Sequence, residues 1–596
     1  MIGFGVGGTG VLAHWVRRGQ PDLDSLNRMH KAAPHRGASL RVQVVGEVGI
    51  GVTGDGEPTG IAGKSTGAVA FGGVIDNAEA FDSSTLEPIG GDSTAALILA
   101  SIEGRGFEAT VKALRGNFAL VYTDGRSIWC SRDQVGFSAL FYRDDGVRVW
   151  IGSEAKQIVA GANLRREPNL EVIERTFFGL TDLDMPAALE KVERVPRHHA
   201  LHFTGTGSKP TSIFDPAAML ETSSLTIQDV PDVFHKLMDQ AVRRVMRGPD
   251  GIALSGGIDS PAVAAYAAPA HREMFGTPLA ALSSVFPRHP SVDERRFVEP
   301  LAAHFGMPLS TREPVAKPTD GLEQWVLLLD GPFPVVSISE SAELYAWARA
   351  EGVGVLITGE FAEFVVDADG DVLSHLMLNG RMISVAARLR SQRAAGMAPR
   401  AMRRHLARSV TPRYLMKSYK RVRAKPTMVP RPEWITHGPQ PEQYTDIPLR
   451  DRWAKDQLTF FGGAAVLLET HDIIQSWSGI RVRQPWADLD LWEFFLGLRA
   501  EVKHSNPRSK GLLREMLRGR VPDYILDRRD KTVFDDNLKS KMDRTALGRW
   551  LIDPPNRLPW IDYALLAEAI NKPELGIREF MWMKDLAAVQ AFLETW

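Results

Sequence analysis

Short apolar runs separated by glycine and aspartate turns dominate the first third of the chain. The runs at 42–45, 118–122 and 147–151 each have the length of one strand. Apolar runs of this length, bounded by turn residues, predict β-strands rather than helices. Residues 1–205 are therefore expected to form a β-rich α+β domain with a β-sandwich.

The pattern changes after residues 206–230, a segment rich in Ser, Thr, Gly and Pro that is expected to be a linker. From there, apolar residues recur at helical spacing, at Val233, Leu237, Met238, Ala241, Val242 and Val245. Strand-like runs at 252–254, 279–286 and 353–357 then alternate with a helical pattern at 293–304. This alternation predicts an α/β domain over 231–596, with a parallel sheet and crossover helices.

A glycine-rich turn lies between the first predicted strand of this domain and the helix that follows it. It consists of Ser255, Gly256, Gly257, Ile258, Asp259 and Ser260. Glycines let backbone N–H groups approach an anion, and a helix N-terminus favours negative charge. The serines add hydroxyl donors, and Asp259 can hold a divalent cation on the same phosphates. The turn lacks the lysine of a Walker loop; it resembles the S-G-G-x-D-S loop of enzymes that split ATP between its α- and β-phosphates.

Composition narrows the class of protein. A chain of 596 residues with 44% hydrophobic residues is expected to hold more than one domain. The net charge of −1 gives no overall attraction to nucleic acid or membranes, so neither is expected as a partner. The single cysteine, Cys130, excludes an internal disulfide. No apolar run approaches the roughly 18 residues of a transmembrane helix. Because the first residues also lack the pattern of a signal peptide, a cytoplasmic location is expected.

Several further motifs are spread over nearly the whole chain. They are His35-Arg36-Gly37, Arg132-Asp133-Gln134-Val135-Gly136, Gly152-Ser153-Glu154-Ala155-Lys156, Ser291-Val292-Asp293-Glu294, Thr358-Gly359-Glu360, Arg483-Gln484-Pro485-Trp486-Ala487-Asp488, Ser509-Lys510-Gly511-Leu512-Leu513-Arg514 and Arg529-Asp530-Lys531-Thr532-Val533-Phe534. In their order and spacing they resemble motifs of the asparagine synthetase superfamily. That resemblance implies a class II glutamine amidotransferase domain followed by an ATP-pyrophosphatase synthetase domain.

The first domain departs from the family where glutamine would react. A class II amidotransferase needs a cysteine directly after Met1, but position 2 is Ile2, and Cys130 lies in an apolar run far along the chain. Gly72-Gly73-Val74 replaces the family's N-G-E, whose asparagine helps to form an oxyanion hole. The arginine expected to hold the glutamine carboxylate is missing from 49–52. The domain is therefore interpreted as a degenerate scaffold that does not hydrolyse glutamine, so a substrate must supply the amine.

The resemblance implies that the second domain binds ATP and Mg²⁺. It places Asp259 and Glu363 as the magnesium ligands. The family has aspartate at the second position, and the extra methylene of Glu363 shifts the metal unless the backbone compensates. Asp367 is a less favoured substitute for Glu363.

The resemblance also implies roles near the nucleotide and the acceptor. Thr358 and Gly359 would lie near the nucleotide. Glu360 would deprotonate or orient the attacking amine, or else be an ordinary surface carboxylate. Lys531 would contact the α-phosphate and the developing oxyanion, where a compact ammonium stabilises negative charge; its alternative is an ordinary surface lysine.

Other cationic residues fall in two groups. Lys510 and Arg514 lie four apart on a predicted helix, where a structural ion-pair role is as well supported as catalysis. Residues 381–431 form a basic helical insert without Asp or Glu. Solvated helix faces are its ordinary interpretation. Its functional interpretation is contact with an acidic peptide or partner protein, because only Tyr414 and Tyr419 could stack on bases.

Three classes of function remain open. The first is an ATP-dependent peptide cyclase resembling lasso peptide cyclases, which also lack the N-terminal cysteine. It would adenylate an Asp or Glu side chain and form a macrolactam with the peptide's N-terminal amine, releasing AMP and pyrophosphate. This class implies a linear precursor (core) peptide as substrate, with a leader peptidase and a leader-binding protein as further partners. The second is a small-molecule amide synthetase, such as a β-lactam synthetase or an ammonia-using asparagine synthetase. The third is a non-catalytic binding protein.

Overall fold

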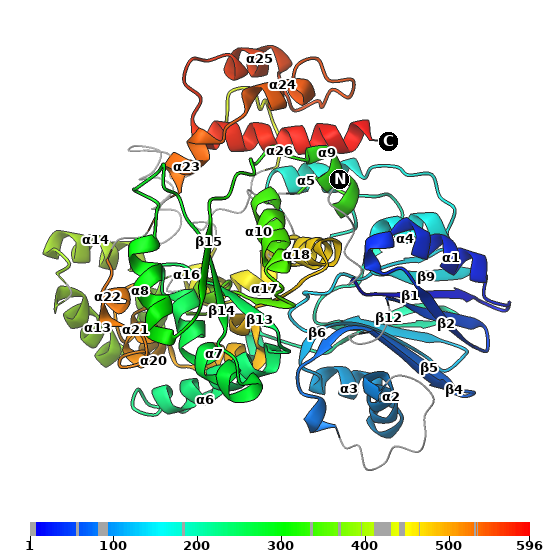
Figure 1. Ribbon diagram of the computed structural model, residues 1–596, viewed down its shortest axis with the longest axis horizontal. Helices are drawn as coiled ribbons and strands as arrows, with labels where there is room; N and C mark the ends of the chain where they lie inside the picture. Colours follow the sequence, from blue (N-terminus) through cyan, green and yellow to red (C-terminus); the bar gives the residue numbers. More distant parts are fainter. Residues whose placement is uncertain are drawn as a thin grey trace.

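The N-terminal apolar runs form two antiparallel sheets in the computed structural model (Figure 1). The first has the order β10 (Glu193–Arg194), β8 (Phe141–Asp144), β9 (Arg148–Gly152), β1 (Gly10–Val16), β3 (Val48–Thr53) and β2 (Leu40–Val45). The second has the order β12 (Gly207–Ser212), β11 (His199–Thr204), β7 (Ile128–Arg132), β6 (Gly116–Thr123), β5 (Gly67–Ile75) and β4 (Thr59–Lys64). The structure describes residues 8–54, 59–81, 93–180, 185–333, 338–366, 371–394, 396–410, 431–439, 447–463, 465–529, 532 and 534–595.

The two sheets pack face to face because alternate residues of each strand point into a shared apolar core. Its buried members come from both sheets and include Val11, Ile50, Ala70, Val121 and Cys130. Helices α1 (Leu23–Ala32) and α4 (Ala155–Gly161) cover the first sheet, whereas α2 (Ser93–Arg105) and α3 (Phe107–Ala113) cover the second (Figure 1). This helix–sheet–sheet–helix arrangement agrees with the amidotransferase-like domain that the sequence resemblance implies.

The second domain is built on a five-stranded parallel sheet. Its order is β15 (Leu309–Arg312), β14 (Ala280–Ser284), β13 (Asp250–Ala253), β16 (Val355–Ile357) and β17 (Arg481–Arg483), and every neighbouring pair is parallel. The chain enters at the central strand β13, builds β14 and β15 on one side, and then crosses to β16 and β17. The strand order therefore reverses between β13 and β16.

Helices cover both faces of this sheet. On one face lie α6 (Val230–Val245), α7 (Asp259–Phe275), α8 (Arg295–Phe305), α11 (Ala362–Val366), α19 (Leu489–Gly497), α21 (Gly511–Met516) and α22 (Asp523–Leu526). On the other lie α9 (Leu322–Leu329), α10 (Ile338–Ala350), α18 (Ala465–Ser478), α24 (Arg544–Leu551), α25 (Tyr563–Ile570) and α26 (Ile577–Glu594), with α5 (Leu170–Phe177) from the first domain. The remaining helices are α12 (Val372–Leu378), α13 (Met382–Ala394), α14 (Pro399–Val410), α16 (Leu449–Gln457), α17 (Thr459–Gly463), α20 (Ala500–Lys503) and α23 (Asp535–Ser540).

The structure forms the elements expected from apolar patterning. The runs at 42–45, 118–122 and 147–151 lie in or overlap β2, β6 and β9, and those at 252–254, 279–286 and 353–357 overlap β13, β14 and β16. The helical pattern at 293–304 corresponds to α8. The predicted fold class, an α+β sandwich domain followed by a parallel α/β domain, is confirmed.

The predicted linker at 206–230 starts too early. Gly207–Ser212 forms β12, an edge strand that pairs with β11 across a tight turn. Its residues are polar because an edge strand is largely exposed, and Pro210 is tolerated there because an edge strand can lack one ladder hydrogen bond. A polar edge strand therefore has the composition of a linker.

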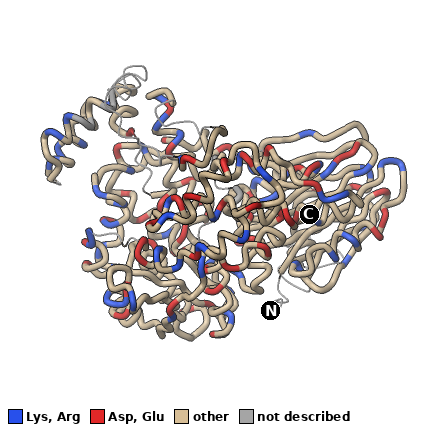
Figure 2. Tube along the Cα trace, turned by 90° about the horizontal axis from the view of Figure 1, so that it is seen from above, with Lys and Arg blue, Asp and Glu red and all other residues tan. Residues whose placement is uncertain are grey.

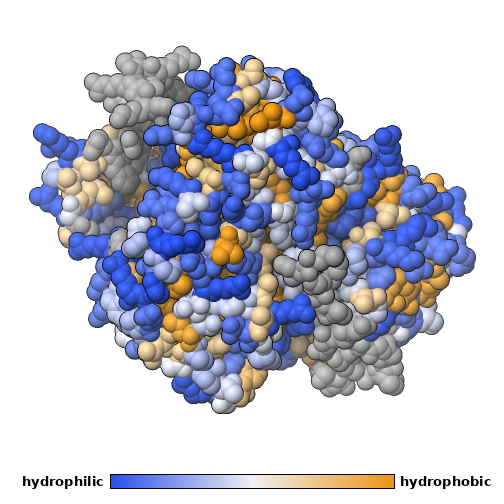
Figure 3. All heavy atoms as spheres, turned by 45° about the horizontal axis from the view of Figure 1, so that its top comes forward, coloured by the Kyte–Doolittle hydropathy of each residue, from blue (hydrophilic) through white to orange (hydrophobic). Residues whose placement is uncertain are grey.

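No helix within the described ranges is long and apolar enough to cross a membrane. The face drawn in Figure 3 is largely hydrophilic, with apolar side chains in scattered patches.

Candidate active site

Two predicted nucleotide-binding stretches meet at one edge of the parallel sheet. The glycine turn leaves β13, and Thr358-Gly359 leaves the neighbouring β16, at the point where the strand order reverses. A Cβ atom on Gly359 would lie 2.4 Å from the backbone nitrogen of Ser260, so only glycine fits. Ligands of open α/β sheets bind outside the carboxyl ends of strands at such a reversal. The fold therefore places both stretches where a nucleotide would bind.

Internal hydrogen bonds shape the glycine turn. The Ser255 N–H donates to Ser260 Oγ at 2.9 Å, and the two serine hydroxyls lie 3.0 Å apart. Gly256 is buried and Gly257 is exposed. Helix α7 begins at Asp259, whose carbonyl accepts a hydrogen bond from the indole of Trp486 at 3.2 Å. The exposed side of the turn, with Ser255 and Gly257, is therefore the side that can face phosphate.

Lys510 is joined to the predicted metal ligand Asp259. Its Nζ lies 2.6 Å from both carboxylate oxygens of Asp259. From the sequence, Lys510 could have either a structural or a catalytic role. The structure places its charge at the glycine turn. Arg514, by contrast, donates to the carbonyls of Ser509 at 3.0 Å and Leu526 at 2.6 Å, which is a structural role.

Of the two other candidate metal ligands, the structure describes one. Glu363 is exposed on α11, whereas Asp367 lies outside the described residues. Among the described residues, no group of three or more His, Cys, Asp or Glu side chains could hold a metal. This donor set fits magnesium carried in on a nucleotide, because proteins hold Mg²⁺ through one or two carboxylates plus substrate phosphates.

Glu360 lies at the same edge of the sheet. Its Oε2 accepts hydrogen bonds from Thr358 Oγ1 at 3.0 Å and from Gln484 Nε2, just after β17, at 3.4 Å. Burial raises the pKa of the nearby Tyr345, and the Glu360 charge adds to that rise. Glu360 is exposed, so its carboxylate is both oriented by neighbours and open to an incoming amine. Lys531, the other predicted catalytic residue, lies outside the described residues.

The amidotransferase-like motifs of the first domain meet in one buried ion cluster. Glu154 lies 2.6 Å from His35 Nε2, 2.5 Å from Arg36 Nε and 2.6 Å from Lys156 Nζ. Burial would raise the pKa of Glu154, but these three neighbours hold it well below its usual value. Arg36 also pairs at 2.8 Å with Asp472 of α18, in the second domain.

Further ion pairs cross between the domains. Arg132 and Arg194 both pair with Glu469 of α18, at 2.6 and 2.9 Å. Lys156 lies 3.5 Å from Asp330, at the end of α9. The H-R-G, R-D-x-x-G and S-E-x-K motifs therefore hold the first domain against the second. Removing one partner of such a buried pair is strongly destabilising, because it leaves an unpaired buried charge.

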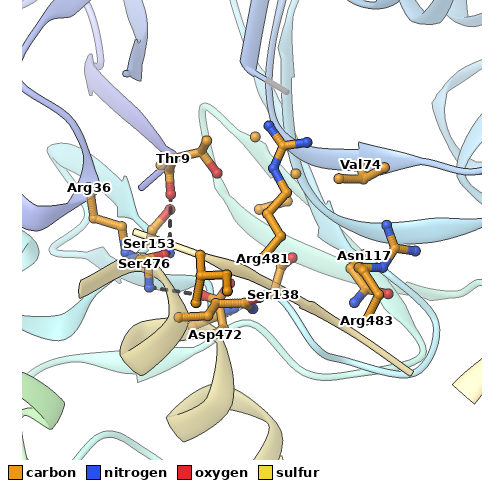
Figure 4. Close-up of a pocket in the computed structure, with 17 residues that line it drawn as sticks. Thr9, Arg36, Val74, Asn117, Ser138, Ser153, Asp472, Ser476, Arg481 and Arg483 are labelled. Atoms are coloured by element: carbon orange, nitrogen blue, oxygen red, sulfur yellow. Dashed lines mark hydrogen bonds and ion pairs between the residues drawn. The ribbon is translucent and has the colours of Figure 1, made fainter. Parts of the chain in front are cut away.

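A small cavity lies where this ion cluster meets the replaced N-G-E motif. Figure 4 shows side chains of the first domain, among them Arg36, Asn117 and Ser153, facing Asp472, Arg481 and Arg483 of the second. Gly72, Gly73 and Val74 also line it. The cavity volume is about 60 Å³, well below the roughly 150 Å³ that admits a benzene ring. A cavity of this volume does not enclose a glutamine molecule, which is larger than benzene.

The cysteine of the chain cannot replace the missing nucleophile. Cys130 is fully buried in the sandwich core, and burial raises its thiol pKa. Position 2, where the family cysteine would stand, lies outside the described residues and is isoleucine in the sequence. Strand β3, which contains 49–52, is buried throughout and carries no arginine.

We expect purified protein to release no glutamate from glutamine above background. The reasons are the absent cysteine, the Gly72-Gly73-Val74 replacement and the small cavity. The measurement is glutamate formation from free glutamine, with and without ATP. Release above the level of heat-denatured protein would mean that another nucleophile acts on glutamine.

Comparison with known proteins agrees with these motifs. The asparagine synthase family model matches residues 234–596, and a glutamine amidotransferase domain model matches 47–160. Asparagine synthetase [glutamine-hydrolyzing] 3 of Bacillus subtilis (strain 168) is 25% identical over 453 residues, which cover 71% of this chain and 67% of that protein.

Two solved structures were also matched. One is the glutamine phosphoribosylpyrophosphate amidotransferase of B. subtilis complexed with ADP and GMP, at TM-score 0.26 and 11% identity, covering 59% of this chain and 81% of that one. The other is an allosteric regulatory enzyme of purine biosynthesis, at TM-score 0.26 and 13% identity, covering 52% of this chain and 82% of that one. Matches at this TM-score do not bear on the assignment.

Proposed function

Because the chain belongs to the asparagine synthase family and is an ATP-dependent amide-forming ligase, we propose that it is a peptide cyclase. In this proposal it adenylates an Asp or Glu side chain of a linear peptide. The peptide's own N-terminal amine then closes a macrolactam, and AMP and pyrophosphate are released. The observation that carries the proposal is that the first domain uses its motif residues for structure. Arg36 and Arg132 form ion pairs with α18, and the cavity beside them is too small to enclose glutamine.

The residues at the sheet edge suit the two chemical steps. In the first step the substrate carboxylate attacks the α-phosphorus of ATP, and pyrophosphate leaves. Ser255, Gly257 and the N-terminus of α7 would hold the departing phosphates. Asp259 and Glu363 would hold Mg²⁺, which neutralises phosphate charge when bound. Lys510, already beside Asp259, would add a cation to the same phosphates.

In the second step the amine attacks the activated acyl carbon, and AMP leaves. Glu360 is oriented by Thr358 and Gln484 and would accept the amine proton. Lys531 would stabilise the negative charge that gathers on the tetrahedral centre. No external ammonia is required, because the amine belongs to the same substrate as the carboxylate. Holding both reacting groups in one site also raises their effective concentration.

The basic insert supports a peptide substrate. Its described part forms α13 and α14, which project at the end of the molecule far from the first domain (Figures 1 and 2). Arg388 is buried and donates to the carbonyl of His504. Among the side chains that the structure describes on these helices, the exposed cations are Arg390, Arg393, Arg400 and Arg403. We propose that this surface attracts an acidic stretch of the precursor peptide or of a partner protein, such as a leader-binding protein or a leader peptidase; residues 411–430 of the insert lie outside the described part.

The test uses a linear peptide with a free N-terminal amine and an internal Asp or Glu. With ATP and Mg²⁺ we expect mass spectrometry to show loss of one water and equal amounts of AMP and product. An N-acetylated copy of the peptide is the matched control. It should support ATP–pyrophosphate exchange but give no ring, because its amine cannot attack.

A second candidate is favoured by one observation, the similarity to a protein named as an asparagine synthetase. That candidate is an ammonia-using synthetase acting on a small carboxylic acid. It predicts pyrophosphate exchange with free aspartate and amide formation with ammonium chloride. Peptides would then be inert in both assays, so the same measurements separate the two functions.

A further inference from the structure

Glu294 precedes α8 but does not cap that helix with its side chain. Its carboxylate instead reaches the glycine turn, where Oε2 accepts a hydrogen bond from the Gly256 N–H at 2.8 Å. Arg528 approaches from the other side and donates to the Gly256 carbonyl at 2.7 Å. Both polar backbone groups of Gly256 are therefore bound by side chains from distant parts of the chain.

The two side chains also bind each other. Arg528 Nη1 lies 2.8 Å from Glu294 Oε1, and the side chains are only 7% and 12% exposed. The guanidinium also lies 4.1 Å above the ring of Phe297, on α8. A Cβ atom on Gly256 would lie 3.0 Å from both Arg528 and Phe297, a tight contact that would push these neighbours outward by a few tenths of an ångström. A charge-assisted pair this well enclosed has one geometry, and it fixes the peptide planes on either side of Gly256.

Thr532 joins the same network. Its hydroxyl donates to Glu294 Oε1 at 2.6 Å and accepts from Arg528 Nη2 at 2.6 Å. Arg528 and Thr532 flank the segment that contains Lys531. Glu294 therefore binds Gly256 of the glycine turn through Oε2, and it binds both Arg528 and Thr532 through Oε1.

We infer that Glu294, Arg528 and Thr532 are positioning residues for adenylation. Glu294 and Arg528 hold Gly256 so that Gly257 and Ser255 present the phosphate-binding side of the turn. Thr532 binds both of these side chains and helps to hold their carboxylate and guanidinium in place. This inference rests on the proposed function, because it assumes that the glycine turn binds the phosphates of ATP.

The test measures binding without any acceptor substrate. Isothermal titration with inorganic pyrophosphate and Mg²⁺ would compare wild type with Glu294→Gln, Arg528→Gln and the double variant. Each single change is expected to weaken binding about tenfold, the scale of losing one charged hydrogen bond. The double variant should be hardly weaker than either single, because both remove the same unit. Glu299→Gln, an exposed residue of α8, is the control and should bind as wild type does.

Thr532→Val gives a second readout that general loss of structure would not produce. It should weaken pyrophosphate binding less than Glu294→Gln does, because it removes one neutral hydroxyl and leaves the Arg528–Glu294 pair in place. Thermal unfolding of each variant, compared with Glu299→Gln, checks that the fold is kept.

Three results would overturn the inference. Tighter pyrophosphate binding by Glu294→Gln would make Glu294 a competing anion rather than a positioning group. Unchanged binding by Glu294→Gln and Arg528→Gln would make their network irrelevant to the ligand. A wild-type protein that binds neither pyrophosphate nor ATP would overturn the proposed function itself, which distinguishes that failure from the other two.

Discussion

Asp259→Asn is expected to keep the fold and lose adenylation by at least about 100-fold, the scale of removing one preorganised charged group. Asp259 is the first residue of α7 and follows directly on the glycine turn, where a metal-bound pyrophosphate would lie. Asparagine keeps the shape but not the charge, so the cation is no longer held. Lys510, 2.6 Å from both oxygens, also loses its ionic partner. ATP–pyrophosphate exchange with the cyclisable peptide measures the effect.

Two companion variants locate the second ligand. Glu363→Gln should be impaired like Asp259→Asn, because both would hold the same cation. Asp367→Asn should be mild. Exchange near the wild-type rate in Asp259→Asn would remove Asp259 from the metal site. A severe loss in Asp367→Asn combined with a mild loss in Glu363→Gln would move the ligand to Asp367.

Local sequence patterns predicted the strand, the glycine turn and the helix that position this site. The strand before Ser255 and the helix after Ile258 follow from a short apolar run, two glycines and a proline in the first helical turn, all neighbours in sequence. The predicted loss of glutamine chemistry rests on single positions such as Ile2. The edge strand β12 was missed because its exposed polar residues are indistinguishable from a linker without knowledge of its partner.

Contacts between distant residues could not be predicted from the sequence. Arg528 and Glu294 are separated by 234 positions, and only the sheet and its helices bring them together. Glu294 was visible as part of a short motif, but nothing in that motif indicates that its carboxylate takes the Gly256 N–H. Lys510 was left undecided because its partner Asp259 is 251 positions away in the sequence, so helical spacing could not show which carboxylate it would meet.

Lys531→Ala is expected to form cyclic product at least about 100-fold more slowly than wild type. Negative charge gathers on the tetrahedral centre during amine attack, and the prediction assigns its stabilisation to this ammonium. Two observations support the assignment: the flanking Arg528 and Thr532 both bind Glu294, and Glu294 binds the glycine turn. Pyrophosphate exchange should fall less than product formation, because exchange reports the first step and the charge grows in the second.

The comparison that isolates this role uses three variants and one peptide. Lys531→Arg should not rescue product formation, because a planar guanidinium cannot place its charge where a compact ammonium did. Lys539→Ala, at an exposed lysine of α23, is the control and should match wild type in both assays. Product is followed as loss of one water by mass spectrometry, and activation as pyrophosphate exchange on the same samples. If Lys531→Ala closes the ring at the wild-type rate, Lys531 is a surface lysine, and another group must stabilise the oxyanion.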